Sequence, residues 1–216
     1  MAELKKTAVI TGAAGGIGRA TLEAFSAAGW EAIGLDGQPA EDLPEGARAE
    51  QVDVSVPEQV EAYFAKLRVS HQELHALVNS SAIPLDKPLV EITPAEWDAV
   101  QAGNLRSVYL ACRSAFPLLK AARGAIVNVS PVHAFPTSIH VAAHAANKGG
   151  VRALTRAMAL EFGAEGVRVN AVLGQVGRAE EVARAILFLA DEQRASFITG
   201  QALVVDGGAA ARLSTQ

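Results

Sequence analysis

Apolar positions along the chain fall into short β-branched runs that alternate with longer segments of helical periodicity. The short runs predict strands at residues 7–11, 31–36, 51–54, 74–79, 124–130, 167–173 and 202–205. Helices are expected at 19–28, 94–119, 141–162 and 178–191, and a further helix opens at Ser55 and Pro57. Thr93 and Glu96 form a capping box that starts the helix at 94–119.

The expected strands are apolar nearly throughout, which is typical of parallel strands that are covered on both faces. With right-handed crossovers this gives an α/β fold, a Rossmann-type doubly wound parallel sheet in three layers. Ligands of such sheets bind at the carboxyl ends of the strands. We expect one domain over residues 1–216, with a loop at 37–47, where glycine, proline and acidic residues gather.

Composition narrows the class of protein. Half of the 216 residues are apolar and 19% are charged, as in a globular domain. A net charge of −4 without a basic run argues against a nucleic-acid partner. The single cysteine, Cys112, excludes an internal disulfide and is expected to be a buried small residue. Residues 1–6 are no signal peptide, and no apolar run approaches the ~20 residues that span a membrane, so a cytoplasmic location is expected.

Residues 11–18 read TGAAGGIG and connect the first expected strand to the first expected helix. Gly12 permits a tight turn, Gly16 lets the backbone approach a pyrophosphate, and Gly18 allows close packing of helix and strand. The free N–H groups of the helix N-terminus then face the phosphates. The alternative is a glycine-rich turn with no ligand, but the strand-turn-helix context favours a dinucleotide.

Asp36 ends the second expected strand, where a carboxylate can accept hydrogen bonds from the adenosine ribose. The same charge repels a 2′-phosphate, and no basic residue stands at 13–15 or directly after Asp36. NAD(H) is therefore favoured over NADP(H). The alternative is an acidic residue that is simply solvated at the end of a strand.

Several further motifs follow in order: DV at 53–54, LVNSSA at 77–82, NLRSV at 104–108, VRVNAV at 167–172, ITGQ at 198–201 and VDGG at 205–208. Together with TGAAGGIG they make the chain resemble the short-chain dehydrogenase/reductase family along almost its whole length. The resemblance implies an NAD-dependent oxidoreductase acting on an alcohol/ketone pair. The residues implied to contact the cofactor are Gly12, Gly16, Ile17, Gly18, Asp36, Asp53, Val54, Asn79 and Lys148.

The catalytic positions depart from this family. Its signature is a tyrosine with a lysine four residues later, where the lysine holds the nicotinamide ribose and the phenol exchanges a proton with the substrate. Lys148 matches the lysine, but His144 stands at the tyrosine position. Pro131 stands at the position of the substrate-orienting serine. Ser130 is the adjacent substitute, although neighbouring residues at a strand end point to opposite sides.

A segment of the family is also missing. After residue 174 the family continues with a nicotinamide-contacting threonine and a helical lid over the substrate, whereas this chain passes through 175–177 into the next helix. The site is therefore expected to be more open and wetter, which weakens the electrostatic interactions that catalysis uses.

The implied catalytic residues are Asn104, His144 and Lys148, with Ser130 as the neighbouring alternative. The imidazole of His144 is chemically able to act as acid or base, and a cation at Lys148 would lower its pKa. Its shorter ring would need a shifted substrate or a bridging water, so the alternative is a residue that only fills the old site. His140 and His144 are four apart on a helix, but without a third ligand we expect no metal.

Three functions follow. The first is an NAD-dependent oxidoreductase with a small-molecule substrate and altered or impaired catalysis. The second is a catalytically silent partner or regulatory subunit of an active relative. The family resemblance implies dimers or tetramers, homo-oligomeric or hetero-oligomeric, built on the helices at 94–119 and 141–162. The third is a cofactor-sensing protein without chemistry, which the sequence does not separate from the second.

Overall fold

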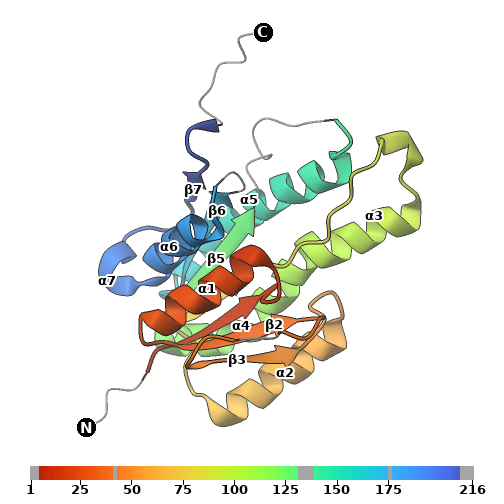
Figure 1. The fold of residues 1–216 in the computed structure, drawn as a ribbon. Helices are drawn as coiled ribbons and strands as arrows, with labels where there is room; N and C mark the ends of the chain where they lie inside the picture. The colour runs from red at the N-terminus through yellow and green to blue at the C-terminus, as the bar shows by residue number, and fades with distance from the viewer. Residues whose placement is uncertain (1–4, 41–42, 131–138, 175–176, 210–216) are drawn as a thin grey trace.

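Parallel strands make up the centre of the molecule. The computed structural model describes residues 5–40, 43–130, 139–174 and 177–209. Within these ranges seven strands pair in the order β3-β2-β1-β4-β5-β6-β7, all in parallel (Figure 1). The strands are β1 (Thr7–Thr11), β2 (Glu31–Asp36), β3 (Ala47–Gln51), β4 (Ala76–Asn79), β5 (Ala125–Ser130), β6 (Arg168–Gly174) and β7 (Ala202–Val205). The predicted doubly wound sheet is confirmed, and the strand order reverses between β1 and β4.

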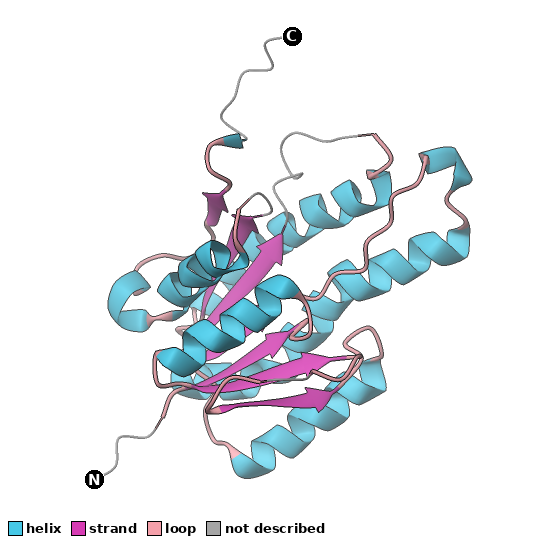
Figure 2. Cartoon of the chain, viewed as in Figure 1, coloured by secondary structure: helices cyan, strands magenta, loops and turns pink. Residues whose placement is uncertain are grey.

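Helices cover both faces of this sheet and give the three predicted layers (Figure 2). The α-helices are α1 (Gly16–Ala27), α2 (Pro57–Ser70), α3 (Pro94–Gln101), α4 (Ser107–Ala122), α5 (Ala142–Gly163), α6 (Ala179–Ala190) and α7 (Glu192–Ala195). A 3-10 turn, η1 (Leu89–Glu91), precedes α3, and a π-helical turn, η2 (Ala102–Arg106), joins α3 to α4. Side chains of α2, α4 and α5 share one apolar cluster, whereas those of α1 and α6 share the other. In the described part of the chain, none of these helices is both long and apolar enough to cross a bilayer.

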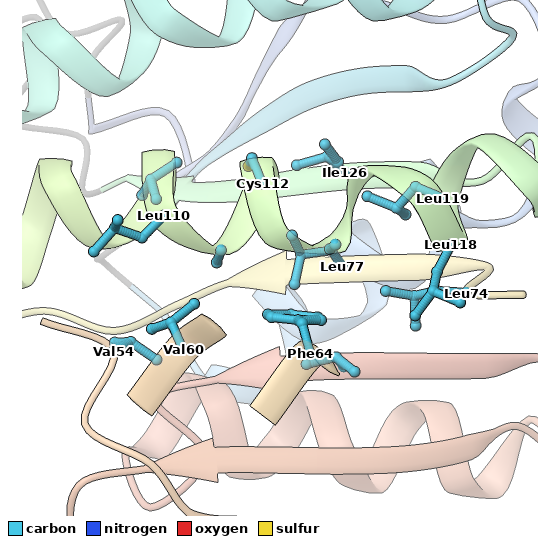
Figure 3. Close-up of a cluster of buried hydrophobic side chains, with 14 of the residues drawn as sticks. Val54, Val60, Phe64, Leu74, Leu77, Leu110, Cys112, Leu118, Leu119 and Ile126 are labelled. Carbon is cyan, nitrogen blue, oxygen red and sulfur yellow. The ribbon is translucent and has the colours of Figure 1, made fainter. Parts of the chain in front are cut away.

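The core follows from the alternation of side chains along the strands. Val9 and Leu77 point to the cluster under α2, α4 and α5, whereas their neighbours Ile10 and Val78 point to the cluster under α1 and α6. Figure 3 shows the first cluster, in which Phe64 of α2 lies close to Leu77. A fully buried side chain of this size stabilises the fold by about 1.5–3 kcal/mol. Cys112 lies in the same cluster at 1% exposure, so the expectation of a buried small residue is confirmed.

The third strand was predicted too late in the sequence. The prediction placed it at 51–54, but β3 ends at Gln51. Val52 and Val54 are buried beyond the strand, where they pack in the cluster with α2. The apolar residues at 52 and 54 are therefore explained by a buried loop and do not belong to a strand. β3 itself lies at the edge of the sheet with half-exposed side chains, so it lacks the apolar run of the inner strands.

The helix expected at 94–119 is longer and less regular than predicted. Its capping box is confirmed, since the Thr93 hydroxyl accepts from the Glu96 N–H at 3.2 Å and the Glu96 carboxylate accepts from the Thr93 N–H at 2.8 Å. The helical path runs on to Ala122, with the π-helical turn η2 in its middle. A π turn adds one residue to the helix and shifts the apolar positions that follow it, whereas the sequence prediction assumed one unbroken helix.

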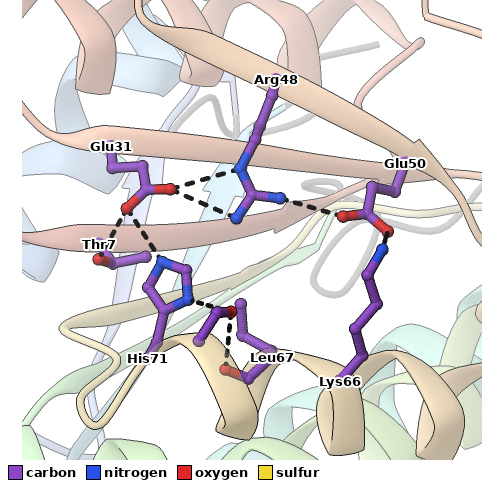
Figure 4. A network of polar contacts seen from close by, with 8 residues as sticks. Thr7, Glu31, Arg48, Glu50, Lys66, Leu67 and His71 are labelled. Atoms are coloured by element: carbon purple, nitrogen blue, oxygen red, sulfur yellow. Dashed lines mark hydrogen bonds and ion pairs between the residues drawn. The ribbon is translucent and has the colours of Figure 1, made fainter.

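A network of ion pairs lies near the amino ends of the first three strands (Figure 4). Glu31 of β2 accepts hydrogen bonds from Arg48 at 3.3 Å and from the Thr7 hydroxyl at 3.4 Å, and it lies 3.1 Å from His71 Nε2. Burial alone would raise the pKa of Glu31, but His71 and Arg48 together outweigh it and hold the pKa below its usual value. The network joins β1, β2 and β3 to the end of α2.

His75 at the same edge gives a testable pH dependence. Its Nδ1 accepts the Thr7 N–H at 3.1 Å, and burial lowers its pKa below 6.5, against the opposing charge of Glu73. Below pH 6.5 the unfolded chain therefore binds more protons than the folded chain, so His75 makes the free energy of unfolding fall as the pH falls. His75→Asn keeps a side-chain acceptor but removes the titration. We expect a shallower loss of stability between pH 7 and pH 5 by urea denaturation, and an unchanged slope would contradict this role.

Candidate functional site

A cavity of about 670 Å³ lies at the carboxyl ends of the strands, where the strand order reverses. Its walls come from the glycine loop, the ends of β2 and β4, the segment before α2, α5 and the start of α6. The lining includes many of the residues singled out from the sequence, namely Gly12, Gly16, Ile17, Gly18, Asp36, Asp53, Val54, His144 and Lys148.

The glycine loop has the geometry that its sequence predicts. Gly12 has a φ of +72°, which favours glycine, and a Cβ there would lie 2.8 Å from the Ser80 backbone. A Cβ on Gly18 would lie 2.0 Å from the Gly12 carbonyl oxygen, so only glycine allows the helix to pack so closely. A Cβ on Gly16 would meet nothing within 4 Å, because this position faces open space. The backbone at Gly16 is thus accessible to a ligand in the cavity.

The segment after β4 is tied to the glycine loop. The Thr11 hydroxyl accepts from the backbone N–H groups of Ser80 at 3.1 Å and Ser81 at 3.4 Å. Ser80 and Ser81, together with Ile83 and Pro84, line the cavity, although none of the four is among the site residues predicted from the sequence. Their place directly after a buried strand was the signal available in the sequence.

Asp36 is held at the rim by the backbone. Its Oδ2 accepts from the Ala14 N–H and its Oδ1 from the Gln38 N–H, each at 3.0 Å. Asp53 is held similarly, because its Oδ1 accepts from the N–H and hydroxyl groups of Ser55 at 2.9 and 2.7 Å. Two carboxylates therefore face the part of the cavity next to the glycine loop.

Asn79 does not line the cavity, in contrast to the other residues of the predicted cofactor set. Its Nδ2 donates to Asn128 Oδ1 at 2.8 Å and to Cys112 Sγ at 3.4 Å, and Asn128 in turn donates to the Thr155 hydroxyl at 2.9 Å. Burial raises the pKa of the Cys112 thiol to about 12. In this structure the Asn79 side chain therefore links β4 and β5 to the helices behind them.

Asn104 lies in the π-helical turn η2 and is 1% exposed. Its Nδ2 donates to the Ile83 carbonyl at 3.0 Å, and its Oδ1 accepts from the Ile83 N–H. Its neighbour Gly103 lines the cavity, and a Cβ there would lie 2.3 Å from Ile83 Cδ1. Asn104 thus fixes the position of the cavity wall after β4. Both polar atoms of its side chain are hydrogen-bonded to the backbone of Ile83.

Lys148 and His144 lie one turn apart on α5, and both line the cavity. Lys148 is 2% exposed, and burial lowers the pKa of its ammonium to about 8. His144 is half-buried. The predicted proton donor and the predicted ribose contact are therefore brought together as the helical spacing requires.

The remaining catalytic candidates are placed differently. Ser130 is fully buried and does not line the cavity, whereas Val129 before it does. Pro131 lies outside the described residues. The sequence analysis placed His140 on the same helix as His144, and this prediction is wrong. His140 precedes α5 and has a φ of +66°. Among residues 5–40, 43–130, 139–174 and 177–209, no three His, Cys, Asp or Glu side chains are grouped to hold a metal ion.

The short connection after β6 brings α6 to the cavity. Gly174, Gly177, Ala179 and Val182 all line it, so the start of this helix forms part of the wall. The sequence indicated the missing segment but did not reveal which residues would take its place. Residues 175 and 176 of this connection lie outside the described part of the chain.

These features fit a nicotinamide dinucleotide. The open position at Gly16 leaves room for a pyrophosphate against the start of α1, and the Asp36 carboxylate stands where it could accept hydrogen bonds from a ribose. Lys148 lines the same cavity from the second turn of α5. The fold and the cavity thus define a dinucleotide-binding α/β protein.

Comparisons with known proteins narrow this class. The short chain dehydrogenase family model matches residues 6–180, and a model described as enoyl-(acyl carrier protein) reductase matches residues 171–210. The chain belongs to the short-chain dehydrogenase family, whose members bind nicotinamide cofactors.

Individual relatives match over nearly the full length. The chain is 32% identical to the 3-oxoacyl-[acyl-carrier-protein] reductase FabG of Chlamydia trachomatis, covering 96% of this chain and 98% of the relative. It is also 32% identical to the meso-2,3-butanediol dehydrogenase of Serratia marcescens, covering 95% of each. The ligand-free aldohexose dehydrogenase of Thermoplasma acidophilum superposes with a TM-score of 0.93 at 28% identity, covering 98% of this chain and 96% of that chain.

Proposed function

We propose that the protein binds NAD(H), in preference to NADP(H), and is an alcohol/ketone oxidoreductase with altered catalysis. The observation that carries the proposal is the Asp36 carboxylate, which lines the cavity and is fixed by the Ala14 and Gln38 N–H groups. A fixed negative charge there accepts hydrogen bonds from a ribose diol and repels a 2′-phosphate. The named activities of the relatives, reduction or oxidation of carbonyl and hydroxyl groups, support the reaction class.

The chain's own residues would divide the work as follows. The free N–H groups at the start of α1 bind the pyrophosphate, and the ammonium of Lys148 holds the nicotinamide ribose. When bound, the cofactor supplies or accepts the hydride. The imidazole of His144 then exchanges a proton with the substrate oxygen, directly or through a water. Asn104 keeps the wall at Ile83 in place during this exchange.

The catalysis is proposed to be altered because the proton donor has changed. An imidazole is shorter than a phenol, and its ordinary pKa near 6.5 differs from that of tyrosine near 10. The connection after β6 is short, so Gly177 and Ala179 stand where a longer cover would shield a substrate. The alignment with the FabG relative extends over 244 positions, which exceeds the 216 residues of this chain, as an internal deletion requires.

Cofactor preference is tested by Asp36→Asn, which removes the charge and keeps the shape. We expect NAD(H) to raise the melting temperature of the wild type more than NADP(H) does. In the variant the dissociation constant for NADP(H) divided by that for NAD(H) should fall about tenfold, which corresponds to about 1.4 kcal/mol. Asp98→Asn is the matched control, because Asp98 is exposed on α3 and does not line the cavity. An absence of any stabilisation by NAD(H) would sink the proposal.

An apolar groove favours a second candidate function, that of a partner subunit. It measures about 600 Å³ and lies between η2, the start of α4, and α5, with a lining of Gln101, Leu105, Arg106, Tyr109, Gly150, Ala153, Leu154 and Ala157. We propose that this face joins the chain to a second copy or to an active relative, and that the pairing persists even where catalysis is weak. Tyr109 lines this groove and is 48% exposed.

The proposed interface is tested by placing a negative charge in the groove. Tyr109→Glu is expected to convert an oligomer into a monomer in analytical ultracentrifugation, because the carboxylate would be buried without a partner. Val69→Glu serves as the control, since Val69 is 89% exposed at the end of α2 and lies outside the groove. A monomeric wild type that pairs with no relative from its native source would contradict the interface.

A further inference from the structure

Lys148 differs from the other described lysines in its surroundings. It is 2% exposed, and within residues 5–40, 43–130, 139–174 and 177–209 no carboxylate lies within 4 Å of its Nζ. Four other lysines are each paired with an acid at 2.9–3.3 Å and are more exposed, namely Lys6, Lys66, Lys87 and Lys120. Lys148 is thus a desolvated amine on the wall of a cavity.

This environment favours the neutral form of the amine. Burial penalises the ammonium and brings the pKa of Lys148 to about 8. At pH 7.5 roughly a quarter of such amines are unprotonated, compared with about 0.1% for a lysine of ordinary pKa. The neutral amine carries the lone pair that attacks a carbonyl carbon, and desolvated lysines in apolar sites are activated in this way.

The cavity around Lys148 suits a small apolar carbonyl compound. Ile83, Pro84 and Val129 contribute apolar walls, and Gly103 and Gly174 leave space. His144 lines the same cavity one helical turn from Lys148, so a group able to carry protons is close to the amine. In the family signature this position carries a phenol, whereas here it carries an imidazole, which can both accept and donate a proton.

We propose that Lys148 is a covalent binding site for small apolar aldehydes, with which it forms an imine. The Nζ lone pair adds to the carbonyl carbon, and the carbonyl oxygen takes up a proton to give a carbinolamine. The nitrogen then expels that oxygen, and the two amine hydrogens leave with it as one molecule of water. His144 carries protons between the two atoms. No electrons are gained or lost, so the step needs no oxidant or reductant.

Reductive trapping tests the site. The full chain is incubated with benzaldehyde and sodium cyanoborohydride at pH 7.5, and adducts are located by intact mass and peptide mapping. We expect one benzyl adduct at Lys148, formed at least tenfold faster than at Lys66, whose side chain is 72% exposed. Lys148→Arg keeps the charge and should lose this adduct, with an unchanged circular dichroism spectrum. His144→Gln should slow the adduct at Lys148 without changing the rate at Lys66.

The competing outcome is labelling that follows exposure, with Lys148 no faster than Lys66, and it would overturn the inference. Mapping of the wild type alone decides this, even where Lys148→Arg fails to fold. The inference goes beyond the proposed function and fails separately from it. Slower trapping in the presence of NAD(H) supports a shared cavity, whereas unchanged trapping at saturating NAD(H) contradicts the proposed cofactor site and leaves the imine intact.

Discussion

Gly16→Val is expected to weaken NAD(H) binding at least 100-fold while the protein stays folded. The position faces open space, so the new side chain strains nothing in the free protein and projects to where a pyrophosphate would approach the backbone. A 100-fold loss corresponds to about 2.7 kcal/mol of binding free energy. Calorimetric titration with NADH measures the loss of binding. Thermal melting measures the free energy of unfolding, which should change by less than about 1 kcal/mol.

Gly18→Ala is the matched contrast, because it adds a single methyl group to the same loop. That methyl group would lie 2.0 Å from the Gly12 carbonyl oxygen, and backbone cannot move aside as the end of a side chain can. We expect a loss of about 3 kcal/mol or more in the free energy of unfolding. If Gly16→Val retained tight NADH binding, the pyrophosphate could not lie where we place it. If Gly18→Ala melted like the wild type, the close packing at Gly12 would be wrong.

His144→Tyr, combined with Pro131→Ser, is expected to raise carbonyl reductase turnover about 100-fold or more. The change restores the phenol of the family signature one helical turn from Lys148, and it restores the hydroxyl that the signature carries at position 131. Well-placed general acid catalysis contributes typically ~10²–10⁴-fold. The measurement is NADH oxidation across a panel of small ketones, with NADH binding determined separately for each variant.

His144→Phe with Pro131→Ser controls for bulk, since phenylalanine has the ring of tyrosine without its hydroxyl. An equal gain in both variants would show that the turnover of the wild type is limited by packing at position 144 and not by the lack of a proton donor. An absence of gain with NADH still bound would mean that the short connection after β6 leaves the substrate unheld. Robust wild-type turnover that His144→Ala abolishes would instead favour a working imidazole and argue against a silent subunit.

Local pattern was enough to predict the strands and helices of the sheet and the glycine loop, because their burial follows from periodicity and their turns from glycine. The position of the edge strand β3 was predicted wrongly, because its half-exposed residues form no apolar run. Asn79 and Asn104 show a second limit. Both were predicted from motifs, but the partners of their amide groups, Asn128 and the Ile83 backbone, come from segments more than 20 residues away in sequence. Which way a side chain turns depends on such distant neighbours.

The two ends of the sheet have separate tasks, which bears on how the protein can be altered. The cavity lies at the carboxyl ends of the strands, whereas Glu31, His71 and His75 lie at their amino ends. A five-residue strand such as β1 spans about 17 Å. Substitutions that far apart combine additively, because they share no partners. Stabilising changes gathered at the amino edge therefore form a reserve against which site variants can be introduced, so a library for new activity is best built on a chain strengthened there.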